Sequence, residues 1–129
     1  MKYARNLVYL AHPYGGSEQK KEDSIRVEAG LNAMQDGGYL IINPLTEPAV
    51  AKAAADCDYR EDMILAYCGG MLSVCNLVIF CPGWEDSPGC RYEYEIAKKH
   101  NIPRIFLTKN EAAIIREFAA KVRMEAMAA

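Results

Sequence analysis

The sequence predicts a single α/β domain built on a doubly wound parallel sheet. Short, continuously apolar segments alternate along the chain with longer helical segments, and turn residues separate them. Strands that are buried on both faces have this appearance, because helices cover both sides of a parallel sheet. A chain of 129 residues has the usual size of one domain, and no linker-like stretch divides it. We therefore expect residues 1–129 to form one three-layer sandwich with a flavodoxin-like, Rossmann-like topology.

Four short apolar segments are the expected strands of this sheet. They lie at Asn6–Ala11, Tyr39–Ile42, 77–81 and 104–107, and turn residues close each of them. Right-handed crossovers leave few arrangements of parallel strands. We expect the order 2-1-3-4, in a sheet of four or five strands in which a partner chain completes one edge.

Helical segments are expected between the strands. Ser17 offers an N-cap for the first helix, which places Ile25, Ala29 and Met34 on one side and ends at the glycine pair 37–38. The other expected helices are residues 59–74, weakened by Gly69 and Gly70, residues 89–100, and a last helix capped by Asn110. Residues 49–55 are either a short helix or part of a long loop over the site.

Composition and charge narrow the class of protein. The chain is 51% apolar and 25% charged, as in ordinary globular proteins. A net charge of -2 gives no general attraction to a polyanion, so we do not expect nucleic acid as a partner, and the pair Lys20-Lys21 is interpreted as a solvated helix face. The longest apolar run is too short for a membrane span or a signal peptide. We expect a cytoplasmic protein.

The cysteines predict neither a disulfide framework nor a metal site. Their number is odd and their spacing includes no Cys-x-x-Cys pair; they are Cys57, Cys68, Cys75, Cys81 and Cys90. We interpret them as small buried hydrophobic residues. Cys90 is a special case, because the start of a helix favours a thiolate.

The topology predicts where a ligand binds. In such sheets ligands bind beyond the carboxyl ends of the strands, at the switch point between the first and third strands. The loops at 11–17 and 82–90 lie there, and they are rich in glycine and turn residues. Gly15 and Gly16 either allow the backbone to approach a ligand closely or simply make the turn.

The second of these loops leads into a helix. Pro88 suits the first helical position and Ser87 the N-cap, which leaves the N–H groups of Gly89 and Cys90 free. Ser87 either only caps the helix or joins these groups in binding a phosphate or carboxylate. Glu85 and Asp86 in the preceding loop are interpreted either as surface charges or as residues that approach a ligand.

Glu93 is a candidate site residue. It lies within the first turn or so of the expected helix, where the helix dipole favours an ionised carboxylate, as displacement at an anomeric carbon requires. From its position alone, a surface glutamate that only complements the dipole is the favoured interpretation. Three further residues each have two interpretations. Tyr9 is either a core or a site residue, and His12 is either a packed or a ligand-orienting residue. Trp84 either stacks on a base or covers an apolar edge.

The sequence resembles the nucleoside 2-deoxyribosyltransferase-like superfamily. The similarity covers roughly residues 6 to 107 and is carried by Val8-Tyr9-Leu10-Ala11, by Asn43-Pro44 and by the segment 83–97. Small, largely uncharacterised members of the superfamily share its Pro-Gly-Trp-Glu-x-Ser-x-Gly loop. The most specific spacing is that of Ser87, Gly89, Glu93 and Ala97.

The resemblance implies roles for individual residues. Glu93 attacks C1′ of a deoxyribosyl group, and the hydroxyl of Tyr9 contacts its carboxylate. An aspartate before the third strand handles the leaving base or orients the sugar. Asp62 is the first candidate for this aspartate, Asp58 the second and Asp56 the third. Ser87 favours a 5′-phosphate over a free 5′-hydroxyl.

The chain departs from the family pattern at three places. Asp62 stands farther from the third strand than the family's aspartate, because residues 67–70 look like an insertion. Asn76 replaces an aspartate at the start of that strand, where we expect a structural role. Glu95 replaces a glycine and is expected to crowd the contact between helix and sheet.

The function that follows is an N-glycosidase or deoxyribosyltransferase acting on a (deoxy)nucleoside or its 5′-monophosphate. It needs no metal or redox cofactor, because the chemistry is acid–base and covalent. A nucleotide-binding module without turnover is the alternative, and a flavodoxin-like FMN protein is disfavoured because the first loop has only Ser17 for a phosphate. By the resemblance we expect a homodimer or homotetramer. Residues 117–129 are either an apolar contact face between subunits or an ordinary helix packed on its own sheet.

Overall fold

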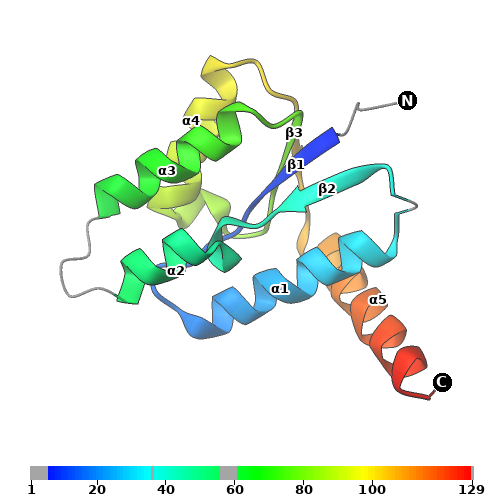
Figure 1. The fold of residues 1–129 in the computed structure, drawn as a ribbon. Helices are drawn as coiled ribbons and strands as arrows, with labels where there is room; N and C mark the ends of the chain where they lie inside the picture. The colour runs from blue at the N-terminus through cyan, green and yellow to red at the C-terminus, as the bar shows by residue number, and fades with distance from the viewer. Residues whose placement is uncertain (1–5, 36, 56–60, 129) are drawn as a thin grey trace.

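The fold is a three-layer α/β sandwich, seen in a computed structural model that describes residues 6–35, 37–55 and 61–128 (Figure 1). Within these residues, four parallel strands form one sheet in the order β2-β1-β3-β4. The strands are β1 (Asn6–Ala11), β2 (Tyr39–Ile42), β3 (Leu77–Phe80) and β4 (Arg104–Phe106). The predicted flavodoxin-like class and the predicted strand order are confirmed.

Strand β1 is the centre of the molecule, because it pairs with β2 on one side and with β3 on the other. Its side chains alternate between two cores. Tyr9 and Ala11 face one core, and Val8 and Leu10 face the other. A strand buried on both faces has to be apolar throughout, which is the pattern the sequence shows.

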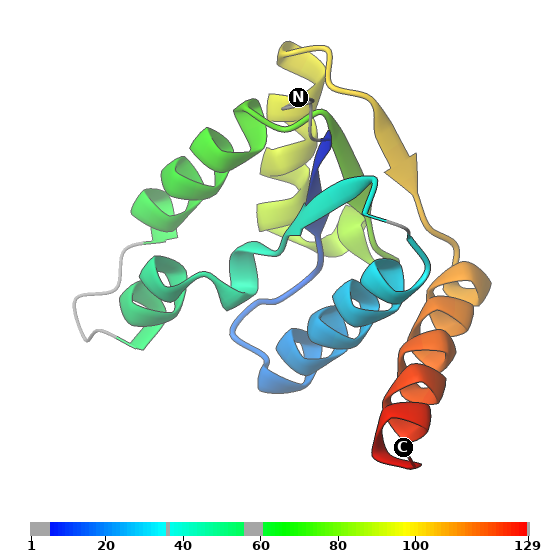
Figure 2. The same cartoon turned by 45° about the vertical axis from the view of Figure 1, so that its right-hand side comes forward.

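Helices cover both faces of the sheet (Figures 1 and 2). The elements α1 (Glu18–Ala33) and α5 (Lys109–Ala128) pack on the Val8 face, while α2 (Pro48–Ala55), α3 (Glu61–Ser73) and α4 (Pro88–Lys99) pack on the Tyr9 face. Two short 3-10 helices, η1 (Pro44–Thr46) and η2 (Trp84–Asp86), lie in the loops. Residues 49–55 are thus helical. No helix in the described part of the chain is both long and apolar enough to cross a membrane.

Helix α1 buries a different face from the one that its large apolar residues suggest. Ile25, Ala29 and Met34 are exposed, whereas Ser24, Val27, Gly30 and Leu31 are buried. The reason is the close approach of α5: a Cβ atom at Gly30 would lie 2.0 Å from the carbonyl oxygen of Ile115. Small residues mark the buried side because two helix backbones meet there.

The last helix also begins earlier than expected. Thr108, rather than Asn110, precedes its first turn, and Glu111 N–H donates to Thr108 Oγ1 at 3.1 Å. In return Thr108 N–H donates to Glu111 Oε1 at 3.2 Å. This reciprocal pair is a capping box, and it fixes the start of α5 at Lys109.

Two departures from the family pattern have simple structural outcomes. Asn76 is structural as expected: its side-chain oxygen accepts from Leu7 N–H at 2.8 Å, and its own N–H donates to Leu7 O at 2.8 Å. Glu95 is exposed, so the expected crowding against the sheet does not occur.

The cysteines within the described residues agree with the prediction. Cys68, Cys75, Cys81 and Cys90 are free and buried. Cys57 lies outside the described residues.

We predict that Gly30→Ala destabilises the protein, because the added methyl group collides with the Ile115 backbone. Overpacking of this kind costs roughly 1–3 kcal/mol. The matched control is Gly70→Ala in α3, where a Cβ atom meets nothing within 4 Å. That change is expected to stabilise the fold by up to about 1 kcal/mol through helix propensity. Urea denaturation measures both, and equal effects of the two substitutions would contradict the close contact.

Candidate functional site

A cleft of about 680 Å³ opens at the carboxyl ends of β1 and β3, where the topology predicts a ligand. Both predicted loops contribute to it, and α3 supplies apolar side chains. The lining residues are 12–16, Glu18, Lys20, Pro44, Leu45, Val50, Ile64, Leu65, Cys68, Gly83, 86–90 and Glu93. Loops rich in polar residues therefore border the cleft, and its buried lining residues include an acidic one, Glu93.

The loop after β1 turns sharply at two successive glycines. Gly15 and Gly16 have φ values of 57° and 81°, which L side chains rarely adopt. Ser17 then caps α1, since its Oγ accepts from Lys20 N–H at 3.2 Å. The turn requires these glycines, and it places the start of α1 on the cleft.

The loop after β3 brings a second helix start to the same cleft. Gly83 has a φ of 88°, and the turn that it makes leads through η2 to Ser87. Ser87 Oγ accepts from Cys90 N–H at 3.3 Å, and Pro88 occupies the first turn, as predicted. Two helix N-termini thus face one cleft, and each carries partial positive charge. Such an arrangement suits an anionic ligand group.

Glu93 lies in the second turn of α4, beyond the first turn where it was expected. Its side chain is buried, and the Tyr9 hydroxyl donates a hydrogen bond to Oε2. Tyr9 itself is fully buried in the centre of β1. Two residues that are 84 positions apart in the sequence are therefore in direct contact at the base of the cleft.

Burial controls the charge of this carboxyl group. It raises the pKa of Glu93 from 4.5 to about 7, although the hydrogen bond from Tyr9 acts in the opposite direction. This corrects the expectation that the helix dipole holds Glu93 fully ionised. Burial, and then the neighbouring Glu93, also raise the pKa of Tyr9, so its hydroxyl keeps the proton that it donates.

The thiols around Glu93 are neutral. Burial raises the pKa of Cys68 to about 11 and that of Cys90 to about 12, and Glu93 contributes to both shifts. The expectation of a thiolate at Cys90 is wrong, because desolvation outweighs the effect of the helix N-terminus. Both cysteines line the cleft as small apolar groups.

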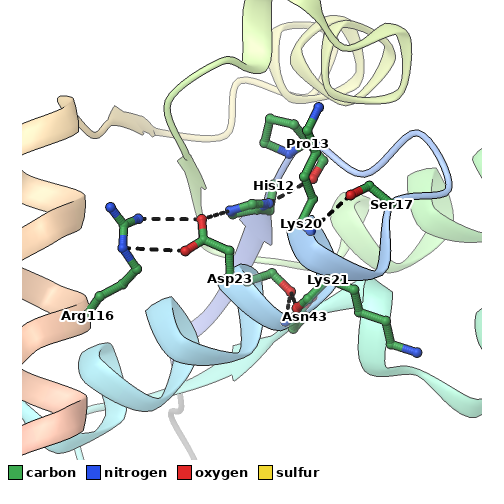
Figure 3. A network of polar contacts seen from close by, with 9 residues as sticks. His12, Pro13, Ser17, Lys20, Lys21, Asp23, Asn43 and Arg116 are labelled. Atoms are coloured by element: carbon green, nitrogen blue, oxygen red, sulfur yellow. Dashed lines mark hydrogen bonds and ion pairs between the residues drawn. The ribbon is translucent and has the colours of Figure 1, made fainter.

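His12 lies on the wall of the cleft, directly after β1 (Figure 3). It is buried, its Nδ1 lies 2.8 Å from the carbonyl oxygen of Pro13, and its Nε2 lies 3.1 Å from Oδ2 of Asp23. The structure thus makes it a packed residue that also borders the ligand space.

Trp84 takes part in an aromatic cluster instead of the cleft lining. Its ring centroid lies 5.1 Å from those of Phe80 and Tyr94 and 5.2 Å from that of Phe106. Of the two interpretations left open, the structure places it over an apolar edge.

None of the three candidate aspartates is among the described residues that line the cleft. Asp62 lies in the first turn of α3, is exposed, and is absent from the cleft lining. Asp58 and Asp56 lie outside the described residues. The aspartate assignment stays a prediction.

Sequence reasoning missed two charged residues of the cleft, Glu18 and Lys20, whereas Asp86 takes the ligand-facing place that was one of its two interpretations. The pair Lys20-Lys21 looks like a solvated helix face in the sequence. The position of Lys20 three residues after the cap Ser17 was the available signal, because the first turn of α1 borders the loop that turns at Gly15.

The fold and this cleft define a doubly wound α/β protein with a cleft at its topological switch point, where proteins of this class bind ligands. The chain belongs to a family described as a domain of unknown function, DUF4406, whose profile matches residues 6–106. The matched stretch includes Tyr9, Ser87 and Glu93 and ends before α5. No curated protein matches the sequence.

We predict that the buried carboxyl of Glu93 makes the fold less stable as pH rises. A glutamate whose pKa is about 7 when folded and about 4.5 when unfolded favours folding below pH 4.5, and this contribution is lost as pH rises through 7. Its full size is roughly 3 kcal/mol. Glu93→Gln keeps an oxygen that can accept from Tyr9 and removes the titration. The variant should therefore gain stability relative to wild type between pH 5 and pH 8.

Denaturant titrations at both pH values measure this difference. Glu95→Gln on the exposed side of the same helix is the control, and it should follow wild type. Parallel stability profiles of wild type and Glu93→Gln would contradict the burial of an ionisable Glu93.

Proposed function

We propose that the protein cleaves or transfers the N-glycosidic bond of a (deoxy)nucleoside or its 5′-monophosphate, with Glu93 as the nucleophile. One observation carries the proposal: a buried carboxyl group borders a cleft of about 680 Å³ and is held by a tyrosine hydroxyl. A carboxylate withdrawn from water is a better nucleophile than a hydrated one, and the cleft is large enough for a ligand of nucleotide size.

The proposed reaction has two displacements. In the first, an oxygen of ionised Glu93 forms a bond to C1′ while the bond between C1′ and the base nitrogen breaks. The electron pair leaves with the base, which takes up a proton from solvent water. In the second, water or another base attacks C1′, gives up a proton to solvent and releases the carboxylate. Tyr9 donates to Oε2, which orients the group and leaves the attack to Oε1.

The other end of the substrate would lie at the two helix N-termini. Gly89 offers a backbone N–H group beside Ser87, whereas the Cys90 N–H that was expected to be free is already bonded to Ser87 Oγ. The turn at Gly15 and Gly16 borders the same space. Lys20 adds a full positive charge. These groups favour a substrate that carries a phosphate.

A nucleotide-binding module without turnover is the second candidate. The acidic residues among the described lining residues are Glu18, Asp86 and Glu93, and Asp62 is not one of them. Cleavage needs a proton donor for the leaving base, whereas binding alone needs none. The anion-binding groups of the cleft, which include Lys20 and the start of α4, are all that the module requires.

We predict that wild-type protein releases free base from at least one 2′-deoxynucleoside 5′-monophosphate during overnight incubation, followed by chromatography. Glu93→Ala should lower the rate at least about 10³-fold, because the nucleophile is lost. Glu95→Ala, on the exposed face of α4, is the matched control and should retain the wild-type rate. The wild-type rate should rise with pH through about 7 as Glu93 ionises.

The absence of release would overturn the enzymatic proposal, provided that free nucleosides with an acceptor base also give none. Calorimetry with the same nucleotides then tests the binding module. Micromolar binding without turnover would support that second candidate.

We predict that Lys20→Gln weakens the binding of a nucleoside 5′-monophosphate by about tenfold, equivalent to about 1.4 kcal/mol. The loss of one charge beside the phosphate is the cause, so binding of the matching free nucleoside should change little. Lys21→Gln is the control, since the neighbouring side chain is not part of the cleft lining. Equal effects of Lys20→Gln on nucleotide and nucleoside would place the phosphate elsewhere.

A further inference from the structure

A polar network connects the cleft to the C-terminal helix through three elements (Figure 3). His12 follows β1, Asp23 lies in α1, and Arg116 lies in α5. His12 Nε2 lies 3.1 Å from Asp23 Oδ2, and Arg116 Nε lies 3.4 Å from Asp23 Oδ1. The side chain of His12 is 6% exposed, so this imidazole has little access to water.

Both partners of the imidazole are oxygen atoms that can only accept hydrogen bonds. One is the carbonyl oxygen of Pro13, 2.8 Å from Nδ1, and the other is the carboxylate oxygen of Asp23. A ring nitrogen without a proton would direct its lone pair at one of these oxygens. Both contacts are hydrogen bonds only when each ring nitrogen donates, which gives the ring a positive charge.

Arg116 determines how the carboxylate is oriented. Its Nε faces Oδ1 at 3.4 Å and its Nη1 faces Oδ2 at 3.5 Å, so the planar guanidinium lies along both oxygens. Asp23 and Arg116 are each about one-third exposed, at 32% and 33%. The pair is partly withdrawn from water. The Asp23 Oδ2 atom that Arg116 contacts is also the atom that lies beside His12 Nε2.

The network is not what holds α5 to α1. Val27 and Leu31 of α1 pack in the same core as Ile115 of α5, and Gly30 brings the two backbones together. Apolar packing therefore already holds α5 against α1, and the polar network additionally orients the side chain of His12.

Other titratable groups surround the network. Lys20 of α1 extends beside Pro13 (Figure 3). Cys81, directly after β3, interacts electrostatically with Asp23, Arg116 and Cys90 of α4, and burial keeps its thiol neutral by raising its pKa. Asp23 is thus the group in this set that supplies negative charge to His12.

We propose that Asp23 and Arg116 are positioning residues that lock His12 into the wall of the cleft as a doubly donating cation. With both N–H groups bonded inside the protein, His12 offers a ligand its charge and shape and does not pass a proton to it. An anionic ligand group is favoured beside it. Arg116 lies beyond residues 6–106, so α5 contributes to this arrangement from outside the stretch that the family profile matches. The proposal does not depend on the chemistry of Glu93.

Proton NMR of the ¹⁵N-labelled free protein at neutral pH tests the proposal through the ring N–H protons of His12. The chain contains two histidines, and exposed His100 is the internal reference. We expect wild type to show two ring N–H protons of His12 that exchange slowly with water. Arg116→Gln should speed exchange at Nε2 by about tenfold or more, which corresponds to about 1.4 kcal/mol. Exchange at Nδ1, bonded to Pro13, should change less.

Two further variants make the result specific. Asp23→Leu removes the acceptor and should abolish the protection of Nε2, whereas Asp23→Asn keeps an acceptor oxygen and should restore part of it. Arg123→Gln removes an exposed charge from the same helix and should behave as wild type. The proposal is overturned if wild type shows only one protected ring proton on His12, or if Arg116→Gln and Arg123→Gln have the same effect.

Discussion

The contact between Tyr9 and Glu93 is the constraint on which the rest of the site depends. It joins the central strand to the second turn of α4, so both the first residue of the helix and its distance from the sheet have to be fixed. Ser87 and Pro88 fix the start of α4, and Ala97, one turn beyond Glu93 and fully buried, keeps the helix close to the strands. A carboxyl group in this position opposes folding at neutral pH. The apolar packing of both cores has to offset that cost.

The cleft divides into two electrostatic regions. Its exposed part has the positive ends of α1 and α4 together with the side chains of Lys20, Glu18 and Asp86, whereas its buried part has the Glu93 carboxyl group and neutral thiols. Charge on a ligand is therefore best accommodated in the exposed part. The buried part is suited to an uncharged group that can approach a carboxylate. This separation arises because parallel strands place all of their carboxyl ends, and the helix starts that follow them, at one edge.

The sheet could be predicted from the sequence because buried parallel strands are apolar throughout, and Ser87 could be predicted as a cap because capping is local. The buried face of α1 could not be predicted in this way. The contact with α5 at Gly30 selects small residues, while Ile25 and Met34 stay exposed. The pairing of Tyr9 with Glu93 came from the resemblance alone. The raised pKa of Glu93 and the link from His12 to Arg116 depend on burial and on contacts between distant segments, which no local pattern encodes.

The aromatic cluster gives the molecule a built-in optical reporter. The chain has a single tryptophan, and Trp84 opens the short 3-10 helix that leads to the capped start of α4. Its indole is stacked on Tyr94 of α4 and packed against Phe80 at the end of β3. Tryptophan fluorescence therefore originates from one indole, only three residues before Ser87. Any rearrangement of that loop changes the surroundings of the sole emitting indole, without a label or an added dye.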